Sequence, residues 1–141
     1  MTAEDIIAEL DLRAHPEGGY FRETWRGPTV GPGGERAVGT AIFYLLAEDQ
    51  LSRWHRVDAT EIWHFYAGAP LELSTTETGT SVEAHVLGPK LEDGHRPQQI
   101  IGPGIWQSAR SLGSWTLVGC TVSPGFEFSG FEMAPPDFPG A

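Results

Sequence analysis

The stretch SRWHRVDATEIWHFYAGAPLEL, residues 52–73, decides the fold. Its β-branched and aromatic residues favour strands rather than a helix. It also places His55, Glu61 and His64 within ten positions of one another. This combination indicates strands that carry a metal site, an acid/base pair or the wall of a pocket that does no chemistry.

The same β-rich pattern continues through most of the chain. From Tyr20 onward, glycine and proline separate short runs of high β propensity. The runs are YFRETWR (20–26), AVGTAIFYLL (37–46), TEIWHFY (60–66), PLELSTTE (70–77), SVEAHVL (81–87), RPQQII (96–101), WTLVGCTV (115–122) and FEFSGFEM (126–133). About eight strands at this spacing predict an all-β sandwich or small barrel.

The amino terminus has a different pattern. Thr2 is a plausible N-cap, Asp5 follows three residues later, and Ile6, Ile7 and Leu10 have a helical apolar spacing. This arrangement is typical of a capped helix. We therefore expect one short helix before the strands.

Size and charge narrow the classes of function. The 141 residues fit a single domain spanning residues 1–141. Lys plus Arg total 9 against 19 Asp plus Glu, a net charge of −10, so we expect neither nucleic acid nor an anionic membrane as a partner. No apolar run approaches the roughly 20 residues of a membrane span.

Cys120 is the single cysteine and lies in the apolar run WTLVGCTV. One cysteine cannot form an intrachain disulfide, which favours a reducing compartment and hence a cytoplasmic protein. We expect its thiol to be a core side chain rather than a nucleophile.

Side chains on a strand alternate between its two faces. Glu61, Trp63 and Phe65 should therefore share one face, and His64 should lie on the other. A turn at residues 58–59 could form a short hairpin that returns His55 beside Glu61 on the inner face. That geometry would suit a metal.

These residues resemble the first cupin motif, His-x-His, three or four residues, Glu, six residues, Gly. His55, Glu61 and Gly68 match it, while Val57 occupies the place of the second histidine. The second cupin motif, Pro-x-Gly-x-x-His, aligns with GPGIWQ, so that Gln107 takes the place of its histidine. Two of the four usual metal ligands are therefore replaced.

More narrowly, HPEGGYFRETWR, the stretch 52–73 and GIWQSARSLGSWTLVGCTVSPGFEFSGFE are similar to the small single-domain cupins of unassigned function. The resemblance covers about residues 6–135. It implies a cupin-type double-stranded β-helix, or jelly-roll barrel, and commonly a homodimer. It implies no settled reaction.

The segment EGGYFRETWR also resembles a strand of the nucleotide-sugar 3,5-epimerases, cupin-like enzymes without a metal. The resemblance implies a histidine base oriented by a carboxylate, with a tyrosine as acid. His55 matches the base, Glu61 is a candidate carboxylate, and Tyr66 or Tyr44 is a candidate acid.

Three kinds of site remain open. His55, Glu61 and Gln107 could hold a divalent metal weakly, because an amide replaces an imidazole. Alternatively, His55 and Glu61 could work as a metal-free acid/base pair. In the structural alternative, Gln107 bridges His55 and Glu61 and satisfies their buried polar atoms.

The rest of the expected site is a small-molecule pocket in the barrel interior. Aromatic rings with a few polar groups are typical of ligand pockets. Arg22 or Glu23 should point inward, and an inward Arg22 could hold an anionic group of the ligand. We expect His15 at the surface. The candidate ligand-binding residues are Arg22, Trp63, His64, Phe65 and Gln107.

The leading hypothesis is therefore a cupin enzyme, similar to an isomerase or epimerase, that acts on a small polar, sugar-like or aromatic metabolite. His55 would be its base or metal ligand, and Glu61 would be the paired carboxylate. The rival is a cupin that binds a small molecule without turnover.

Overall fold

The computed structural model describes residues 1–139, in which strands predominate. Two short 3-10 helices and one α-helix accompany the strands. The elements are α1 (Ala3–Leu10), β1 (Arg13–Ala14), β2 (Tyr20–Arg26), β3 (Thr29–Val30), β4 (Arg36–Ala37), β5 (Thr40–Ala47), β6 (Leu51–Val57), β7 (Thr60–Gly68), β8 (Leu71–Thr76), β9 (Glu83–Leu87), η1 (Leu91–Asp93), β10 (Gln98–Ile101), β11 (Trp106–Ser111), β12 (Trp115–Ser123), η2 (Phe128–Gly130) and β13 (Phe131–Met133).

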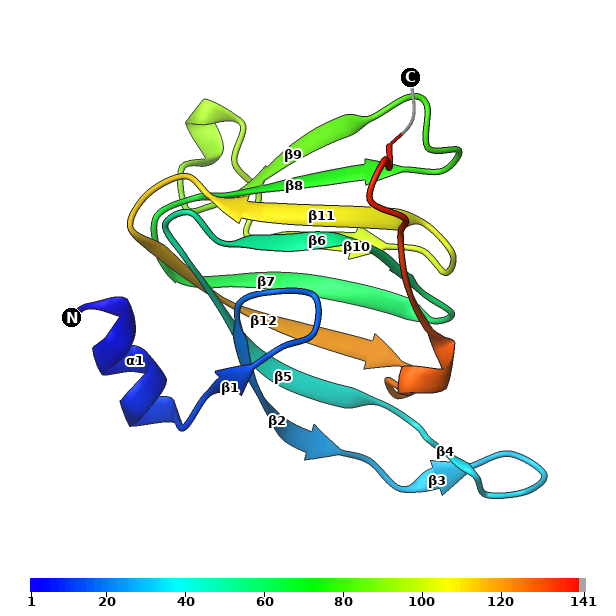
Figure 1. Cartoon of the computed structure of the whole chain (residues 1–141). Coiled ribbons are helices and arrows are strands. Elements are labelled where there is room, and N and C mark those ends of the chain that lie inside the picture. The colour runs from blue at the N-terminus through cyan, green and yellow to red at the C-terminus, as the bar shows by residue number, and fades with distance from the viewer. Residues whose placement is uncertain (140–141) are drawn as a thin grey trace.

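Two antiparallel sheets face each other (Figure 1). The first has the strand order β1-β2-β5-β12-β7-β10, and the second has the order β13-β6-β11-β8-β9. Most neighbouring strands, such as β5 and β12 or β6 and β11, are far apart in sequence, as in a jelly roll. The predicted all-β jelly roll with a short N-terminal helix is confirmed.

The structure contains strands that were not predicted, among them β11 and the short strands β1, β3 and β4. β11, with the sequence WQSARS, was absent from the predicted strands because polar and small residues weaken its β signal. In the predicted run FEFSGFEM, only Phe131–Met133 is a strand, since Phe128–Gly130 forms a 3-10 turn. That turn places Phe126 and Phe128 at the rim of the interior instead of in a sheet.

The space between the sheets is filled mainly by apolar side chains. This core contains Tyr44, Leu46, Trp63, Leu71, Leu73, Leu87, Ile101, Ala109, Val118 and Cys120. The buried free thiol of Cys120 agrees with its predicted place in the core. A second, smaller apolar cluster of Val57, Ala59 and Val122 packs with Phe126 and Phe131 near the rim.

Helix α1 packs on the outer face of the first sheet (Figure 1). The Thr2 hydroxyl accepts a hydrogen bond from the Asp5 backbone N–H at 3.1 Å, and the Asp5 carboxylate accepts one from the Thr2 N–H at 2.8 Å. This is the capping box that the sequence predicted. Ile6 and Leu12 then bury the apolar side of the helix against Leu45 of β5.

The carboxyl-terminal segment packs beyond the expected core limit near residue 135. The Phe138 ring lies 5.4 Å from that of Trp54 and 4.8 Å from that of Trp106, measured between centroids. Ala134 N–H donates to the Trp54 carbonyl at 2.9 Å. This segment therefore covers the second sheet at least as far as Phe138.

Among the described residues, no helix has the length and apolar character needed to cross a membrane.

The core predicts a clear contrast between two leucines. Leu73 is 0% exposed in β8, and Leu91 is 57% exposed in η1. Leu73→Ala should lower the free energy of unfolding by about 2–5 kcal/mol, since it leaves a cavity between the sheets. Leu91→Ala should cost less than about 0.5 kcal/mol. Urea unfolding of both variants measures the difference, and equal losses would contradict this description of the core.

Candidate functional site

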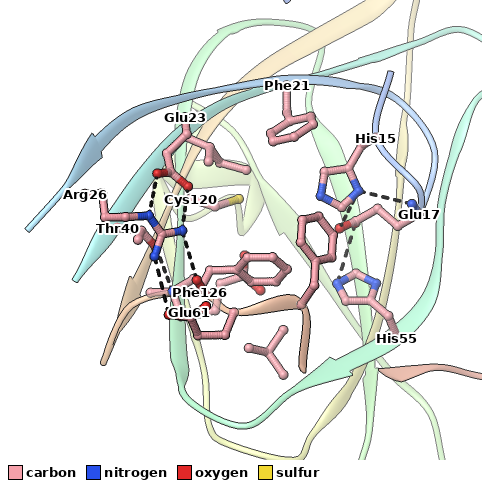
Figure 2. Close-up of a pocket in the computed structure, with 15 residues that line it drawn as sticks. His15, Glu17, Phe21, Glu23, Arg26, Thr40, His55, Glu61, Cys120 and Phe126 are labelled. Carbon is pink, nitrogen blue, oxygen red and sulfur yellow. Dashed lines mark hydrogen bonds and ion pairs between the residues drawn. The ribbon is translucent and has the colours of Figure 1, made fainter. Parts of the chain in front are cut away.

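A pocket opens between the two sheets at the rim formed by residues 126–128 (Figure 2). It contains about 610 Å³ of atom-free space, part of which is open to solvent. Polar groups gather inside it, and phenylalanine rings line its wall. The lining residues that matter below are His15, Glu17, Glu23, Arg26, His55, Glu61, Phe21, Phe126 and Phe128.

His55 and Glu61 both face this pocket, but they reach it from opposite sheets. The predicted hairpin between them is wrong, because β6 pairs with β11 and β13, whereas β7 pairs with β12 and β10. The turn after Val57 carries the chain from one sheet to the other. The two side chains therefore meet across the interior of the sandwich rather than along one sheet.

The loop between β1 and β2 adds a second carboxyl to the pocket, that of Glu17. Glu17 is buried there, and the loop is held on β6 because Arg53 N–H donates to the Glu17 carbonyl at 2.7 Å. Gly18 has a φ of +114°, and a Cβ at this position would collide with the Leu51 carbonyl oxygen. The glycine therefore lets the loop approach β6 closely enough to place the Glu17 carboxyl in the pocket.

The Glu17 carboxyl lies between two imidazole rings (Figure 2). Its Oε1 is 3.4 Å from His15 Nδ1, and its Oε2 is 3.5 Å from His55 Nε2. Ser52 Oγ also donates to Oε2. The expectation that His15 lies at the surface is wrong, since its side chain is 5% exposed.

Other hydrogen bonds define which ring nitrogens carry protons. His15 Nδ1 accepts from the Glu17 backbone N–H at 3.1 Å, so it carries no proton. His55 Nδ1 lies 2.7 Å from the Arg53 carbonyl, which can only accept, so this nitrogen carries the proton of a neutral ring. In the neutral state His55 Nε2 therefore directs a lone pair at the Glu17 carboxyl, whereas the lone pair of His15 Nδ1 already accepts the Glu17 backbone N–H.

A lone pair and a carboxylate would repel each other, so this contact needs one proton. Burial favours the neutral state, with the proton on the carboxyl. In agreement, burial raises the pKa of Glu17 to about 7, against the effect of the Ser52 hydrogen bond. Burial lowers the pKa of His55, and lowers that of His15 to about 4. Glu17 is thus an acid that can exchange its proton near neutral pH.

Glu61 has a different environment, set by Gln107 and Trp63. Trp63 Nε1–H donates to Gln107 Oε1 at 2.8 Å, and Gln107 Nε2–H donates to Glu61 Oε1 at 2.8 Å. An indole N–H can only donate, so it fixes which end of the amide faces Glu61. The predicted bridge from Gln107 to His55 is wrong, because the amide connects Trp63 to Glu61 instead.

The pKa of Glu61 depends on opposing effects. Burial raises the pKa of Glu61 to about 7, while the nearby His55 and the hydrogen bond from Gln107 act to lower it. A donated N–H favours the charged form of a carboxyl. Glu61 is therefore the acid of the pocket whose hydrogen bonding supports the anion.

The mouth of the pocket carries an ion pair between Glu23 and Arg26 of β2 (Figure 2). Arg26 donates from Nε and Nη2 to the two carboxylate oxygens at 2.8 and 2.9 Å, and also from Nη2 to the Phe126 carbonyl at 3.0 Å. Arg26 Nη1 lies 3.6 Å from Glu127 Oε1. Arg26 thus ties strand β2 to the rim segment opposite it.

Some expected ligand-binding residues lie elsewhere. Glu23 rather than Arg22 faces the pocket, and Arg22 is exposed and donates to the Leu10 carbonyl at 3.4 Å. His64 lies on the outer face, as the alternation predicted, where its Nε2 is 3.2 Å from Thr121 Oγ1. Trp63 and Phe65 face inward but belong to the core, so neither ring lines the pocket.

The expected metal ligands do not fit a metal. Gln107 turns its amide N–H toward Glu61, and its carbonyl oxygen already accepts from Trp63. Only His55 and Glu61 of the proposed set retain donor atoms near the pocket. Within residues 1–139, no group of three or more His, Cys, Asp or Glu side chains has an arrangement that could hold a metal ion.

The sequence interpretation missed Glu17, His15 and the two rim phenylalanines. A signal for Glu17 was present in HPEGGY, where an acid precedes two glycines that permit a close backbone approach. Nothing local indicates that this loop folds over the open end of the sandwich, since the contact joins residues 35 positions apart.

The fold and its interior pocket define a cupin. The chain matches the model of the family described as Cupin superfamily (DUF985) over residues 4–134, and it belongs to that family.

Two relatives cover most of this chain. The solved structure of protein SO0799 from Shewanella oneidensis is 34% identical, with a TM-score of 0.89, over 95% of this chain and 85% of that one. The Saccharomyces cerevisiae protein YML079W, described as uncharacterized, is 24% identical over 146 residues, 90% of this chain and 72% of the yeast protein.

More distant structures share the fold alone. A dTDP sugar isomerase from Desulfovibrio desulfuricans is 14% identical, with a TM-score of 0.60, over 89% of this chain and 88% of that one. The oxalate decarboxylase of Bacillus subtilis, a structure concerned with Mn(II) centres, is 13% identical, with a TM-score of 0.62, over 88% of this chain and 30% of that one. The cupin fold of this chain therefore occurs in enzymes of different chemistry.

The raised pKa of Glu17 predicts a pH-dependent effect of Glu17→Gln. The ordinary pKa is 4.5 and the folded value is about 7, so the stability that the protonated carboxyl contributes is present below pH 4.5 and lost as pH rises through 7. Glutamine has no such loss. The free energy of unfolding of the variant, relative to the original protein, should therefore rise by up to about 3 kcal/mol between these limits.

Urea unfolding between pH 4.5 and 8.5 measures this difference. Glu9→Gln is the matched control, because Glu9 is exposed on α1. A difference that stays constant with pH for Glu17→Gln would show that Glu17 ionises normally in the folded protein.

Proposed function

We propose that this protein binds a small metabolite in the pocket and moves protons on it, as an isomerase or epimerase does. The observation that carries the proposal is the buried Glu17 carboxyl, whose Oε2 lies 3.5 Å from the unprotonated Nε2 of His55 inside the pocket. A base and an acid that exchange protons near neutral pH are the requirement for such chemistry.

His55 is the proposed base. Its ring is 1% exposed, its Nδ1–H is held by the Arg53 carbonyl, and its Nε2 faces the pocket side of Glu17. Because burial lowers the pKa of His55, the ring stays neutral, and able to accept a proton, even at a pH below the ordinary pKa of histidine. The backbone carbonyl thus fixes the tautomer that an aspartate or glutamate fixes in many other sites.

The proposed step is proton removal from a carbon next to a carbonyl group. His55 Nε2 takes the proton, the C–H electron pair forms a carbon–carbon double bond, and the carbonyl π electrons move to oxygen. That oxygen receives the Glu17 proton, which gives an enol. Where the first carbon carries a hydroxyl, His55 delivers its proton to the former carbonyl carbon and that hydroxyl returns a proton to Glu17 as the new carbonyl forms, which completes isomerisation. For epimerisation, water delivers a proton to the opposite face of the carbon, the enol proton returns to Glu17, and the hydroxide left behind takes the proton from His55.

This proposal changes the partner expected for His55. The sequence pointed to Glu61 as the orienting carboxylate, whereas Glu17 is the acid beside His55 Nε2. Glu61 remains a ligand-facing group, with its charge supported by Gln107. Tyr44 is less suited to act as the acid, because its hydroxyl donates to the Gly18 carbonyl at 2.5 Å and holds the loop.

The second candidate function is binding without turnover. The apolar part of the pocket favours it, since Phe21, Phe126 and Phe128 provide the aromatic walls that small-molecule sites use. In that case Glu17 and His55 only recognise the ligand.

Deuterium exchange separates the two functions. A panel of small aldoses, ketoses and keto acids in D₂O should include a compound whose hydrogen next to the carbonyl exchanges faster with the protein, as read by proton NMR. His55→Asn should reduce this rate by roughly a hundredfold or more. The rate should also fall as pH rises above about 7, because Glu17 then loses the proton that it must donate.

Glu9→Gln controls for the loss of an acid far from the pocket. If compounds in the panel bind, but neither the original protein nor its variants change the exchange rate, the binding function replaces the enzyme function.

We also propose that this single cupin unit is a cytoplasmic homodimer. Beyond the pairing of Tyr20 and Phe21 with β1, the rest of β2 lies at an edge of its sheet, and Trp25 on this segment is 52% exposed. An unpaired edge with an apolar residue favours pairing with another chain. Light scattering should give about twice 15.3 kDa. A mass of one chain would exclude the dimer.

A further inference from the structure

We propose that the pocket selects a small ligand with a positively charged amine and an aromatic or otherwise apolar ring, and rejects phosphorylated ligands. The inference rests on the proposed function, since it names the ligand class of the same pocket. It follows from which charges line the pocket, which of them are already paired, and what the walls are made of.

Carboxyl side chains outnumber cationic ones in the lining of the pocket. Four carboxyls face the pocket, and Arg26 is the single Lys or Arg among the lining residues of the described chain. Arg26 is already engaged by Glu23, Glu127 and the Phe126 carbonyl. The four carboxyls belong to Glu17, Glu23, Glu61 and Glu127.

The other arginines near this end of the fold point elsewhere. Arg53 donates to the Pro16 carbonyl. Arg56 pairs with Glu132 at 2.7 Å and lies over the Trp106 ring at 4.4 Å. Recognition of a phosphate or diphosphate uses several free cationic or backbone N–H donors. A nucleotide sugar would therefore meet repulsion here without the donors that offset it.

A cation has a partner in the Glu61 carboxyl inside the pocket. Glu61 is 8% exposed, and the N–H from Gln107 supports its anionic form without supplying a positive charge. The neighbouring buried polar group, His55, is neutral and turns an uncharged nitrogen toward the pocket. An ammonium group would supply the positive charge that no side chain of the described lining gives to Glu61.

The walls favour the same ligand class. Phe21, Phe126 and Phe128 line the pocket, with the rings of Phe126 and Phe128 4.9 Å apart in an edge-on arrangement. Phe128 is 57% exposed, so its ring can cover a ligand at the mouth. Aromatic faces attract cations and also bury an apolar ring. Carboxyls inside and aromatic rings at the rim thus match an amine carried by a ring.

A series of probes with matched shape tests this inference. The probes are 2-phenylethylamine, 2-phenylethanol and phenylacetate, which share the ring and differ in charge, together with thymidine diphosphate. Titrations followed by NMR of the imidazole protons give the affinity of each. We expect the amine to bind about tenfold or more tightly than the alcohol, the difference that about 1.4 kcal/mol produces. Phenylacetate and thymidine diphosphate should bind more weakly than the alcohol.

Glu61→Gln should remove most of the advantage of the amine over the alcohol, while Glu9→Gln should leave it unchanged. Tighter binding of either anion, equal binding of amine and alcohol, or no binding of any probe overturns the inference. Those outcomes leave the proposed function to the deuterium-exchange experiment, which uses uncharged and anionic carbonyl compounds instead of amines. An amine preference, together with binding but no exchange in the carbonyl panel, supports the inference and excludes the enzyme function.

Discussion

The hydrogen bond from Trp63 Nε1 to Gln107 Oε1 is the constraint on which the site depends. It joins β7 of one sheet to β11 of the other in a region where the remaining core contacts are apolar. Because the indole can only donate, it leaves Gln107 with an N–H for Glu61. A core contact thus determines the hydrogen bonding, and through it the charge preference, of a carboxyl in the pocket.

This dependence separates the two acids of the pocket. Glu61 and Glu17 are both buried and both have a raised pKa, yet their neighbours differ. Glu61 receives an N–H, which supports a charge, whereas Glu17 faces the free lone pair of the neutral His55 ring, which supports a proton. Two carboxyls of the same type thereby acquire different roles, as in other acid/base sites.

The sequence predicted the parts of the fold that local patterns encode. Residues 20–26 form the predicted strand, the Thr2 and Asp5 capping box is present, and the alternation along β7 places Glu61 and Trp63 inside with His64 outside. Each of these features depends on residues close in sequence. Family motifs further identified the cupin fold, which is confirmed.

What the sequence did not predict depends on contacts between distant segments. Whether the turn after Val57 makes a hairpin or crosses between sheets is decided by β11 and β12, which lie about fifty residues further along the chain. In the same way, Glu17 reaches His55 only because the loop of residues 15–19 folds onto β6. The expectation that Arg22 lies in the pocket was wrong for a local reason. Arg22 and Glu23 alternate along β2, so either side chain could have faced inward.

The two replaced positions of the cupin motifs also acquire a physical meaning. Gln107 stands in the place of a ligand histidine, and it instead links Trp63 with Glu61. Val57, in the place of the other histidine, is a buried apolar residue that packs with Val122 and Phe126. The residue at one of these two motif positions thus makes a hydrogen-bond bridge, and the residue at the other packs in an apolar wall.

The connection that Arg26 makes between β2 and residues 126–127 has a kinetic consequence. A ligand larger than the open part of the mouth can enter only after the rim segment separates from β2, which breaks the contacts of Arg26 with Phe126 and Glu127. Dissolved salt weakens such partly exposed charge contacts. Ionic strength should therefore alter how quickly the pocket opens, and the pocket should exchange its contents faster at high salt than in dilute buffer.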